Sequence, residues 1–183
     1  MSANQTVEVR SDRSAIDFNL LGADGKRYSL QDVRGPLGTL VIFMCNHCPY
    51  VKAALDMMIA DVRGLRPLGV GAVAIMPNDV STYPADSIEN MAKLADERCL
   101  PFPYLLDETQ AVARAYGAAC TPEFFGFNAD LQLKYHGRIA EFSSLKPVPN
   151  AKHEMFDAMA MIAATGEGPR DQKPSIGCSI KWR

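Results

Sequence analysis

Apolar and polar residues follow one another in blocks that predict an ordered series of strands and helices. Two short apolar runs within residues 14–29 flank Ala23-Asp24-Gly25, and an Asp-Gly pair between such runs predicts a β-hairpin. The continuous apolar run 37–45 predicts a central strand that is buried on both faces. The next segment, 49–65, carries apolar residues at helical spacing, with Pro49 acceptable in the first turn.

The alternation continues towards the C-terminus. A strand is predicted over 69–76, and a helix over 87–99 for which Asp86 or Ser87 can serve as the N-cap. After these we expect a strand at 102–107, a helix at 107–117, strands at 123–128 and 131–137, and a last helix over about 151–164. This order predicts parallel strands joined by right-handed crossovers, with antiparallel strands added at the edge.

The predicted fold class is therefore α/β, a central mixed β-sheet flanked by helices with an N-terminal β-hairpin extension. We expect a single domain over residues 14–165, because the chain contains no linker of the kind that separates domains. Residues 1–13 are polar and predict a flexible N-terminal arm, and residues 166–183 predict a C-terminal tail that can dock on the domain.

Composition and charge narrow the classes of function. The net charge of -2, without a basic stripe, disfavours nucleic acid as a partner. The chain shows neither a signal peptide nor an apolar run that could span a membrane, so we expect a cytoplasmic protein without membrane association. Five cysteines in the cytoplasm would normally be reduced, and an odd number disfavours a purely structural disulfide framework.

The chemistry centres on Cys45 and Cys48, which follow a predicted strand and precede a predicted helix. We expect Cys45 at or just before the helix N-terminus, where a thiolate is favoured, and Cys48 placed to resolve a mixed disulfide. His47 lies between them, and its imidazole can stabilise the thiolate or be a solvated loop residue. The alternatives for this pair are buried structural thiols or half of a zinc site.

A second element is Thr121-Pro122, between a predicted helix and a predicted strand. A peptide bond before proline can adopt the cis form at low cost, and a free backbone edge there could hold an extended thiol substrate. The alternative is an ordinary trans proline that opens an edge strand.

The remaining thiols have less distinctive surroundings. Cys178 is a candidate third redox thiol in a tail where Ile176, Ile180 and Trp182 alternate with polar residues, and we expect Cys178 on the face opposite that apolar row. Cys120 is interpreted as a small core residue and Cys99 as structural. Four thiols with His47 could also assemble a metal site. We expect, however, that the protein binds neither a metal nor a cofactor.

The order of these motifs resembles the thioredoxin superfamily. The segments CNHCPYVKA, YPADS, FPYLLDETQAVARAYGA, CTPEFF and PSIGCSIKW are similar to those of bacterial thioredoxin-like proteins related to the alkyl hydroperoxide reductase/thiol-specific antioxidant group. The resemblance implies a thioredoxin-like fold, a redox pair at Cys45 and Cys48, and a cis-proline at Pro122. The chain departs from the peroxiredoxin motif, since Ile42 lies three residues before Cys45 and the proline of that motif is absent.

Three hypotheses of function follow. The first is a thiol–disulfide oxidoreductase in which Cys45 attacks, Cys48 resolves, His47 tunes the pair, and Thr121 with Pro122 forms the substrate platform. Its partners would be protein or small-molecule thiols and disulfides. The second is a thiol-dependent peroxidase acting on peroxides. The third is a non-enzymatic redox sensor or metal-binding module.

Overall fold

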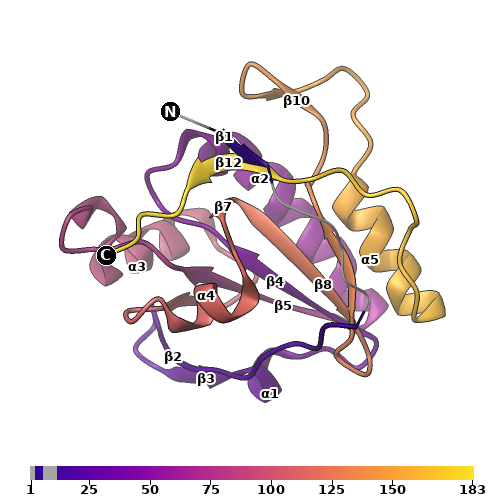
Figure 1. The fold of residues 1–183 in the computed structure, drawn as a ribbon, viewed down its shortest axis with the longest axis horizontal. Coiled ribbons are helices and arrows are strands. Elements are labelled where there is room, and N and C mark those ends of the chain that lie inside the picture. Colours follow the sequence, from indigo (N-terminus) through magenta and orange to yellow (C-terminus); the bar gives the residue numbers. More distant parts are fainter. Residues whose placement is uncertain (1–2, 6–11) are drawn as a thin grey trace.

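The computed structural model describes residues 3–5 and 12–183, and its centre is a seven-stranded mixed sheet (Figure 1). The strands lie side by side in the order β3-β2-β6-β5-β4-β8-β9. Their bounds are β2 Asn19–Gly22, β3 Arg27–Ser29, β4 Gly38–Phe43, β5 Val70–Met76, β6 Tyr104–Leu106, β8 Glu123–Asn128 and β9 Leu133–Gly137. Strands β4, β5 and β6 are parallel, whereas the pairings of β2, β3, β8 and β9 are antiparallel. This sheet confirms the predicted mixed α/β class and the N-terminal hairpin.

Helices cover both faces of the sheet. They are α1 Leu30–Val33, α2 Pro49–Leu65, α3 Ile88–Arg98, α4 Ala111–Tyr116 and α5 Glu154–Thr165, with short 3-10 turns η1 Arg66–Leu68 and η2 Pro84–Asp86. Helices α2, α3 and α5 pack with Leu40 and Ile42 of β4, whereas α1 and α4 pack with Val41 and Phe43. Alternate residues of a strand point to opposite faces, so the continuous apolar run of β4 follows from its burial on both sides.

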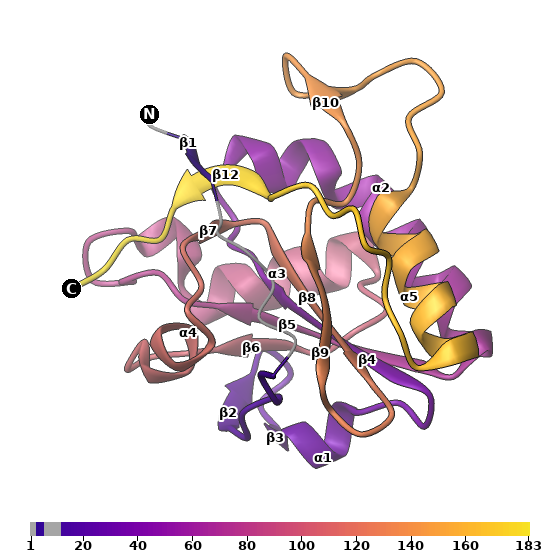
Figure 2. The same ribbon diagram turned by 45° about the vertical axis from the view of Figure 1, so that its right-hand side comes forward.

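Two small sheets lie beside the main one. β12 (Ile176–Ser179) pairs antiparallel with β1 (Ala3–Gln5) on one side and with β7 (Cys120–Thr121) on the other. Figure 2 shows this C-terminal strand, in yellow, running beside β7 near the start of α2. β10 (Phe142–Ser143) and β11 (Lys146–Pro147) form a short hairpin. Most of the predicted arm at residues 1–13 lies outside the described residues, while residues 3–5 pair in this sheet.

Two helices are shorter than the sequence pattern predicts. The helix expected from residue 107 begins at Ala111, because Gln110 has a positive φ of 64° and the Asp107 carboxylate accepts from the backbone N–H of Ala113. The last helix begins at Glu154 rather than near residue 151. None of the helices in residues 12–183 has the length and apolar character needed to cross a membrane.

Candidate functional site

Cys45 and Cys48 lie in the turn that joins β4 to α2. β4 ends at Phe43 and α2 begins at Pro49, so Cys48 is the N-cap residue and Cys45 lies three residues earlier. Proline suits the first helical position, since the N–H that it lacks would be unpaired there. The helix N-terminus therefore meets Cys48 more directly than Cys45, and the expectation that it favours a thiolate on Cys45 is wrong. Both cysteines are buried, with exposed fractions of 1% for Cys45 and 0% for Cys48.

The reduced pair places its negative charge on Cys48. Hydrogen bonding from the Cys45 thiol lowers the pKa of Cys48 to about 4, with further favourable contacts from Cys178, although burial opposes this shift. The same hydrogen bond, burial and the nearby Asp86 carboxylate raise the pKa of Cys45. The Cys48 sulfur also lies 3.2 Å from the Thr121 carbonyl oxygen. This contact is a hydrogen bond only while Cys48 is protonated and its S–H donates to the carbonyl oxygen. We assign the charge to Cys48 because the α2 N-terminus favours an anion there, whereas Asp86 opposes one on Cys45.

Thr121 contacts both sulfurs of the pair. Its hydroxyl oxygen lies 3.5 Å from the Cys45 sulfur, and its carbonyl oxygen faces Cys48. The peptide bond between Thr121 and Pro122 is cis. Sequence positions that are more than 70 residues apart therefore meet at one site, in the arrangement that the resemblance implies.

A buried contact between a carboxylate and an imidazole holds the Thr121-Pro122 loop. The Glu123 carboxylate, with 0% exposure, accepts hydrogen bonds from the backbone N–H groups of Ala119 at 2.7 Å and Cys120 at 3.2 Å. Its other oxygen lies 2.7 Å from Nε2 of His136, which is also buried. A buried carboxylate is stabilised only when such partners compensate its lost hydration, so this pair fixes the loop that carries Thr121.

The C-terminal tail occupies the backbone edge of β7. Cys178 of β12 pairs with Thr121, and Ser179 pairs with Cys120. The hypothesis of a free edge at Thr121 is therefore wrong for this conformation. A Cβ atom at Gly177 would lie 2.1 Å from the Thr121 carbonyl oxygen, so only glycine allows this close approach.

Cys178 is buried, with 5% exposure, and its side chain interacts with that of Cys48. The expectation that it lies opposite the apolar row of the tail is wrong, because residues 176, 178 and 180 alternate with their neighbours and share one face. Ile180 on that row is buried in the core, whereas Ile176 is exposed.

Asp86 organises the turn between the two cysteines. One carboxylate oxygen accepts from the backbone N–H groups of Asn46 at 2.8 Å and His47 at 3.3 Å. The other accepts from the Asn78 side-chain amide at 2.9 Å and lies 2.6 Å from Nδ1 of His47. This last contact is not a hydrogen bond, and it is an ion pair only when His47 is protonated. Ser87, not Asp86, is the N-cap of α3, because its hydroxyl accepts from the Asn90 N–H.

Three different donor atoms meet in the same place. Within the described part of the chain, Cys45, His47 and Asp86 can offer a sulfur, a nitrogen and an oxygen within 4.8 Å of one another. Such a set could hold a zinc ion, which binds all three ligand types. It includes one of the two cysteines of the pair, so metal binding and disulfide formation at Cys45 would exclude each other. Cys99 is exposed at the end of α3 and Cys120 is buried.

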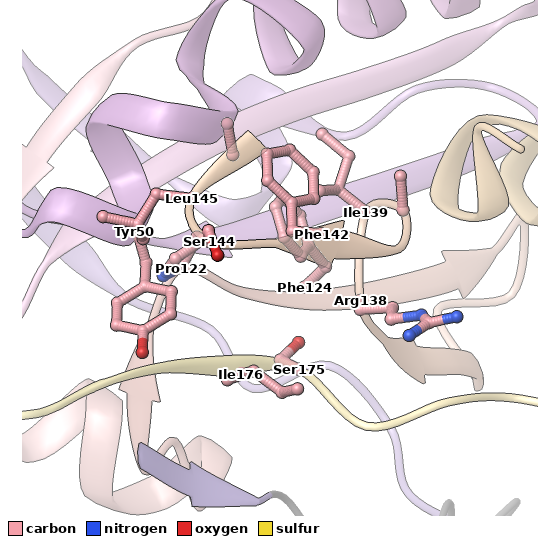
Figure 3. A pocket seen from close by; sticks show the side chains of 12 residues that line it. Tyr50, Pro122, Phe124, Arg138, Ile139, Phe142, Ser144, Leu145, Ser175 and Ile176 are labelled. Atoms are coloured by element: carbon pink, nitrogen blue, oxygen red, sulfur yellow. The ribbon is translucent and has the colours of Figure 1, made fainter. Parts of the chain in front are cut away.

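A largely apolar cavity of about 270 Å³ lies beside Pro122, and the cysteines are not among the residues that line it. Figure 3 shows it between Tyr50 of the first turn of α2, Pro122, and Ile176 of the tail, with Phe124 and Phe142 along its wall. Pro122 and Tyr50 connect the cavity to the pair, since each lies within two residues of a group that contacts a sulfur. The cavity offers room for an apolar side chain beside Pro122, whose neighbour Thr121 contacts both sulfurs.

Asp86 is the site residue whose place beside the pair the sequence analysis missed. It was considered only as a helix cap, yet it follows β5 in the loop 77–87. Parallel strands have their carboxyl ends at one edge of the sheet, so the loop after β5 lies beside the turn after β4. That rule was the signal that could have placed Asp86 near Cys45.

Comparisons with known proteins agree with this geometry. Residues 12–139 match the model of the AhpC/TSA family. A crystal structure of an uncharacterized conserved protein from Geobacillus kaustophilus is 41% identical, with a TM-score of 0.94 over 100% of this chain and 97% of that one. No protein of curated function matches the sequence.

More distant structures share the fold. Peroxidoxin BcpB from Mycobacterium tuberculosis is 17% identical, with a TM-score of 0.60 over 86% of this chain and 96% of that one. The thioredoxin domain of a thiol-disulfide oxidoreductase from Bacteroides vulgatus is 15% identical, with a TM-score of 0.58 over 70% of this chain and 89% of that one. These matches confirm the thioredoxin-like fold, and together with the family match they support a redox function of the thioredoxin-like type.

Proposed function

Because the chain belongs to the AhpC/TSA family, we propose that it is a thiol–disulfide oxidoreductase that uses Cys45 and Cys48 as its redox pair. The observation that carries the proposal is the contact of the two sulfurs with each other and with Thr121 at the start of α2. A disulfide between sulfurs already in contact needs little movement of the backbone. Both redox states are therefore accessible to the same fold.

The reaction can be written for the reduction of a substrate disulfide. Cys45 passes its proton to the Cys48 thiolate through their hydrogen bond, attacks one substrate sulfur and forms a mixed disulfide, and the first substrate thiolate leaves. Cys48 then attacks the Cys45 sulfur, the mixed disulfide breaks, and the second substrate sulfur leaves with the proton of Cys48. The protein has lost two electrons to the substrate. Reversal of the steps oxidises a substrate dithiol.

The neighbouring groups have supporting roles in this proposal. Asp86 disfavours a thiolate on Cys45, and His47, when protonated, offsets that effect by its contact with the same carboxylate. Thr121 and Pro122 form the platform beside the sulfurs. The apolar cavity next to Pro122 suits a substrate that carries an apolar group near its sulfur.

The test is a redox titration in mixtures of reduced and oxidised dithiothreitol, with acid quenching, alkylation and peptide mapping. We expect one two-electron transition that produces a Cys45–Cys48 disulfide. Cys99→Ser is the matched control and should leave the transition unchanged, because Cys99 is exposed at the far end of α3. The absence of a Cys45–Cys48 disulfide even after oxidation with diamide would refute the proposal.

The family match makes a peroxidase the second candidate. The chain has Ile42 three residues before Cys45 and lacks the proline of the peroxiredoxin motif, so the residues that surround a peroxide-cleaving cysteine in that group are not all present. We therefore expect only slow consumption of hydrogen peroxide when dithiothreitol is the reductant. Rapid consumption that is lost in Cys45→Ser would favour the peroxidase, and stoichiometric zinc in the purified protein would favour a metal-binding role instead.

A further inference from the structure

We propose that Cys178 is a third redox thiol, which attacks Cys48 of the Cys45–Cys48 disulfide and moves the disulfide to Cys48–Cys178. This inference rests on the proposed function of the pair and extends it by one step. The product keeps one disulfide in the protein and releases Cys45 as a thiol. The tail strand β12 then takes part in the reaction and does not only stabilise the fold.

The pairing of β12 with β7 directs Cys178 towards the pair. Cys178 and Thr121 are directly opposite in antiparallel register, so their side chains lie on the same face of this sheet. The Thr121 hydroxyl on that face contacts the Cys45 sulfur at 3.5 Å. The Cys178 thiol therefore faces the same space as Cys45 and Cys48.

Cys48 is the middle member of the three thiols. Its side chain interacts with those of Cys45 and Cys178, and it has no exposed surface. Disulfide exchange requires a thiol close to one sulfur of the bond that breaks. In the oxidised pair, Cys48 is the sulfur next to Cys178, and Cys45 is the leaving group.

The tail is held in place by contacts that do not involve sulfur. The Gln110 side-chain amide donates to the carbonyl oxygens of Lys181 and Pro77, each at 2.8 Å, and accepts from the backbone N–H of Arg183 at 3.0 Å. Gly177 allows the backbone to approach Thr121. Cys120 does not lie on the face of the small sheet that Cys178 and Thr121 share. It is adjacent to Thr121 along β7, so its side chain lies on the other face.

The exchange is balanced without any further reactant. The Cys178 sulfur forms a bond to Cys48, the Cys45–Cys48 bond breaks, and the proton that Cys178 loses is regained by Cys45. No net oxidation occurs, since one disulfide and one thiol are present before and after. The outcome is a thiol at Cys45 while the protein remains oxidised.

The experiment maps disulfides after oxidation with diamide, acid quenching and alkylation of the remaining thiols. In the wild-type protein we expect both Cys45–Cys48 and Cys48–Cys178, in a ratio that does not change with protein concentration. Cys45→Ala should convert to Cys48–Cys178 alone. Cys120→Ser, the matched control, should keep both disulfides.

A second part of the experiment displaces the tail from β7. Gly177→Val should reduce the Cys48–Cys178 fraction at least tenfold and leave Cys45–Cys48 intact, and Cys178→Ser gives the same expectation if Gly177→Val does not fold. Oxidised wild-type protein with Cys45–Cys48 but no detectable Cys48–Cys178 would overturn this inference and leave the proposed function standing. If Cys45–Cys48 itself does not form, the proposed function fails first.

Discussion

Thr121 and Cys178 lie opposite each other in the antiparallel pairing of β7 with β12. Thr121 touches both sulfurs of the proposed redox pair, and Cys178 interacts with one of them. The backbone edge on which an extended substrate would pair is thus filled by the chain itself.

We predict that the thiolate of the reduced protein resides on Cys48. Its pKa of about 4 depends most on hydrogen bonding from Cys45, so Cys45→Ala should raise it. Thiolate absorbance at 240 nm should persist in the wild-type protein at pH 6 and fall to about half as the pH approaches 4. The Cys99→Ser variant should behave like the wild type, whereas an unchanged thiolate signal at pH 6 in Cys48→Ser would contradict the assignment.

The same shift predicts a pH dependence of stability. A group whose pKa is lower in the folded state binds fewer protons there, so it stabilises the fold above its unfolded pKa and loses this effect as the pH falls through the folded value. Between about pH 4 and pH 8.5, the reference value of a free thiol, the free energy of unfolding of the reduced protein should rise with pH. Urea unfolding at pH 5 and pH 7.5 measures this rise, which should be smaller in Cys48→Ser and in the oxidised protein.

Asp86→Asn should make Cys45 a faster nucleophile. The carboxylate is one cause of the raised pKa of Cys45, so its neutralisation stabilises the thiolate that Cys45 must form before it attacks a substrate sulfur. The rate constant for the reduction of oxidised glutathione should rise by up to roughly tenfold, since a pKa change of one unit corresponds to about 1.4 kcal/mol. Asp61→Asn is the control, because Asp61 is buried against His153 elsewhere on α2. An equal change of rate in both variants would remove Asp86 from the argument.

His47→Ala should change the rate of this reaction in the opposite direction. Nδ1 of the imidazole lies 2.6 Å from the Asp86 carboxylate, and when protonated the imidazole offsets the negative charge of that group. Without it, the carboxylate acts more strongly on Cys45, the Cys45 thiolate loses stability, and the reaction becomes slower. In the double variant with Asp86→Asn the effect of His47→Ala should largely vanish. A full effect in that background would show that His47 acts on the thiols directly.

Gln110→Ala should loosen the tail. Loss of its buried amide leaves the Pro77 and Lys181 carbonyl oxygens without this donor, at a cost of about 1–3 kcal/mol in the free energy of unfolding. Alkylation of Cys178 in the reduced protein should become faster, while Cys120 remains protected. Trp182→Ala is the milder comparison, since the contact of Arg114 with the partly exposed indole contributes only about 0.5–1 kcal/mol. Equal alkylation rates in wild type and Gln110→Ala would contradict this role.

Local patterns predicted most of the fold, because each element carries its own signal. The run around Val41 and Phe43 is apolar on both faces, and Pro49 marks the start of α2, so the strand, the turn and the helix around Cys45 could be predicted. The short helix α4 was mispredicted at its start, since the turn at Gln110 depends on its buried contacts with the tail. Propensity along the chain does not contain such contacts.

The parts of the site that come from distant segments of the chain were harder to predict from the sequence. Alternation indicated a strand around Cys178, but periodicity cannot give the place where a strand docks. Its pairing with Thr121 depends on the close approach at Gly177, which becomes evident only once the partner strand is known. Asp86 likewise meets Cys45 through the order of the parallel strands rather than through any motif of its own.

The tether between α5 and β12 has a consequence for competition at β7. Because β12 is joined to the domain by a short segment, residues 166–175, its local concentration at that edge is on the order of millimolar or higher. An extended peptide replaces the tail only if its concentration, or its affinity for the β7 edge, is high enough to compete with this local concentration of β12. Weakly bound thiol peptides are thereby excluded, and a partner with a second point of attachment gains the advantage. Selectivity at these sulfurs is then a property of chain connectivity as much as of surface chemistry.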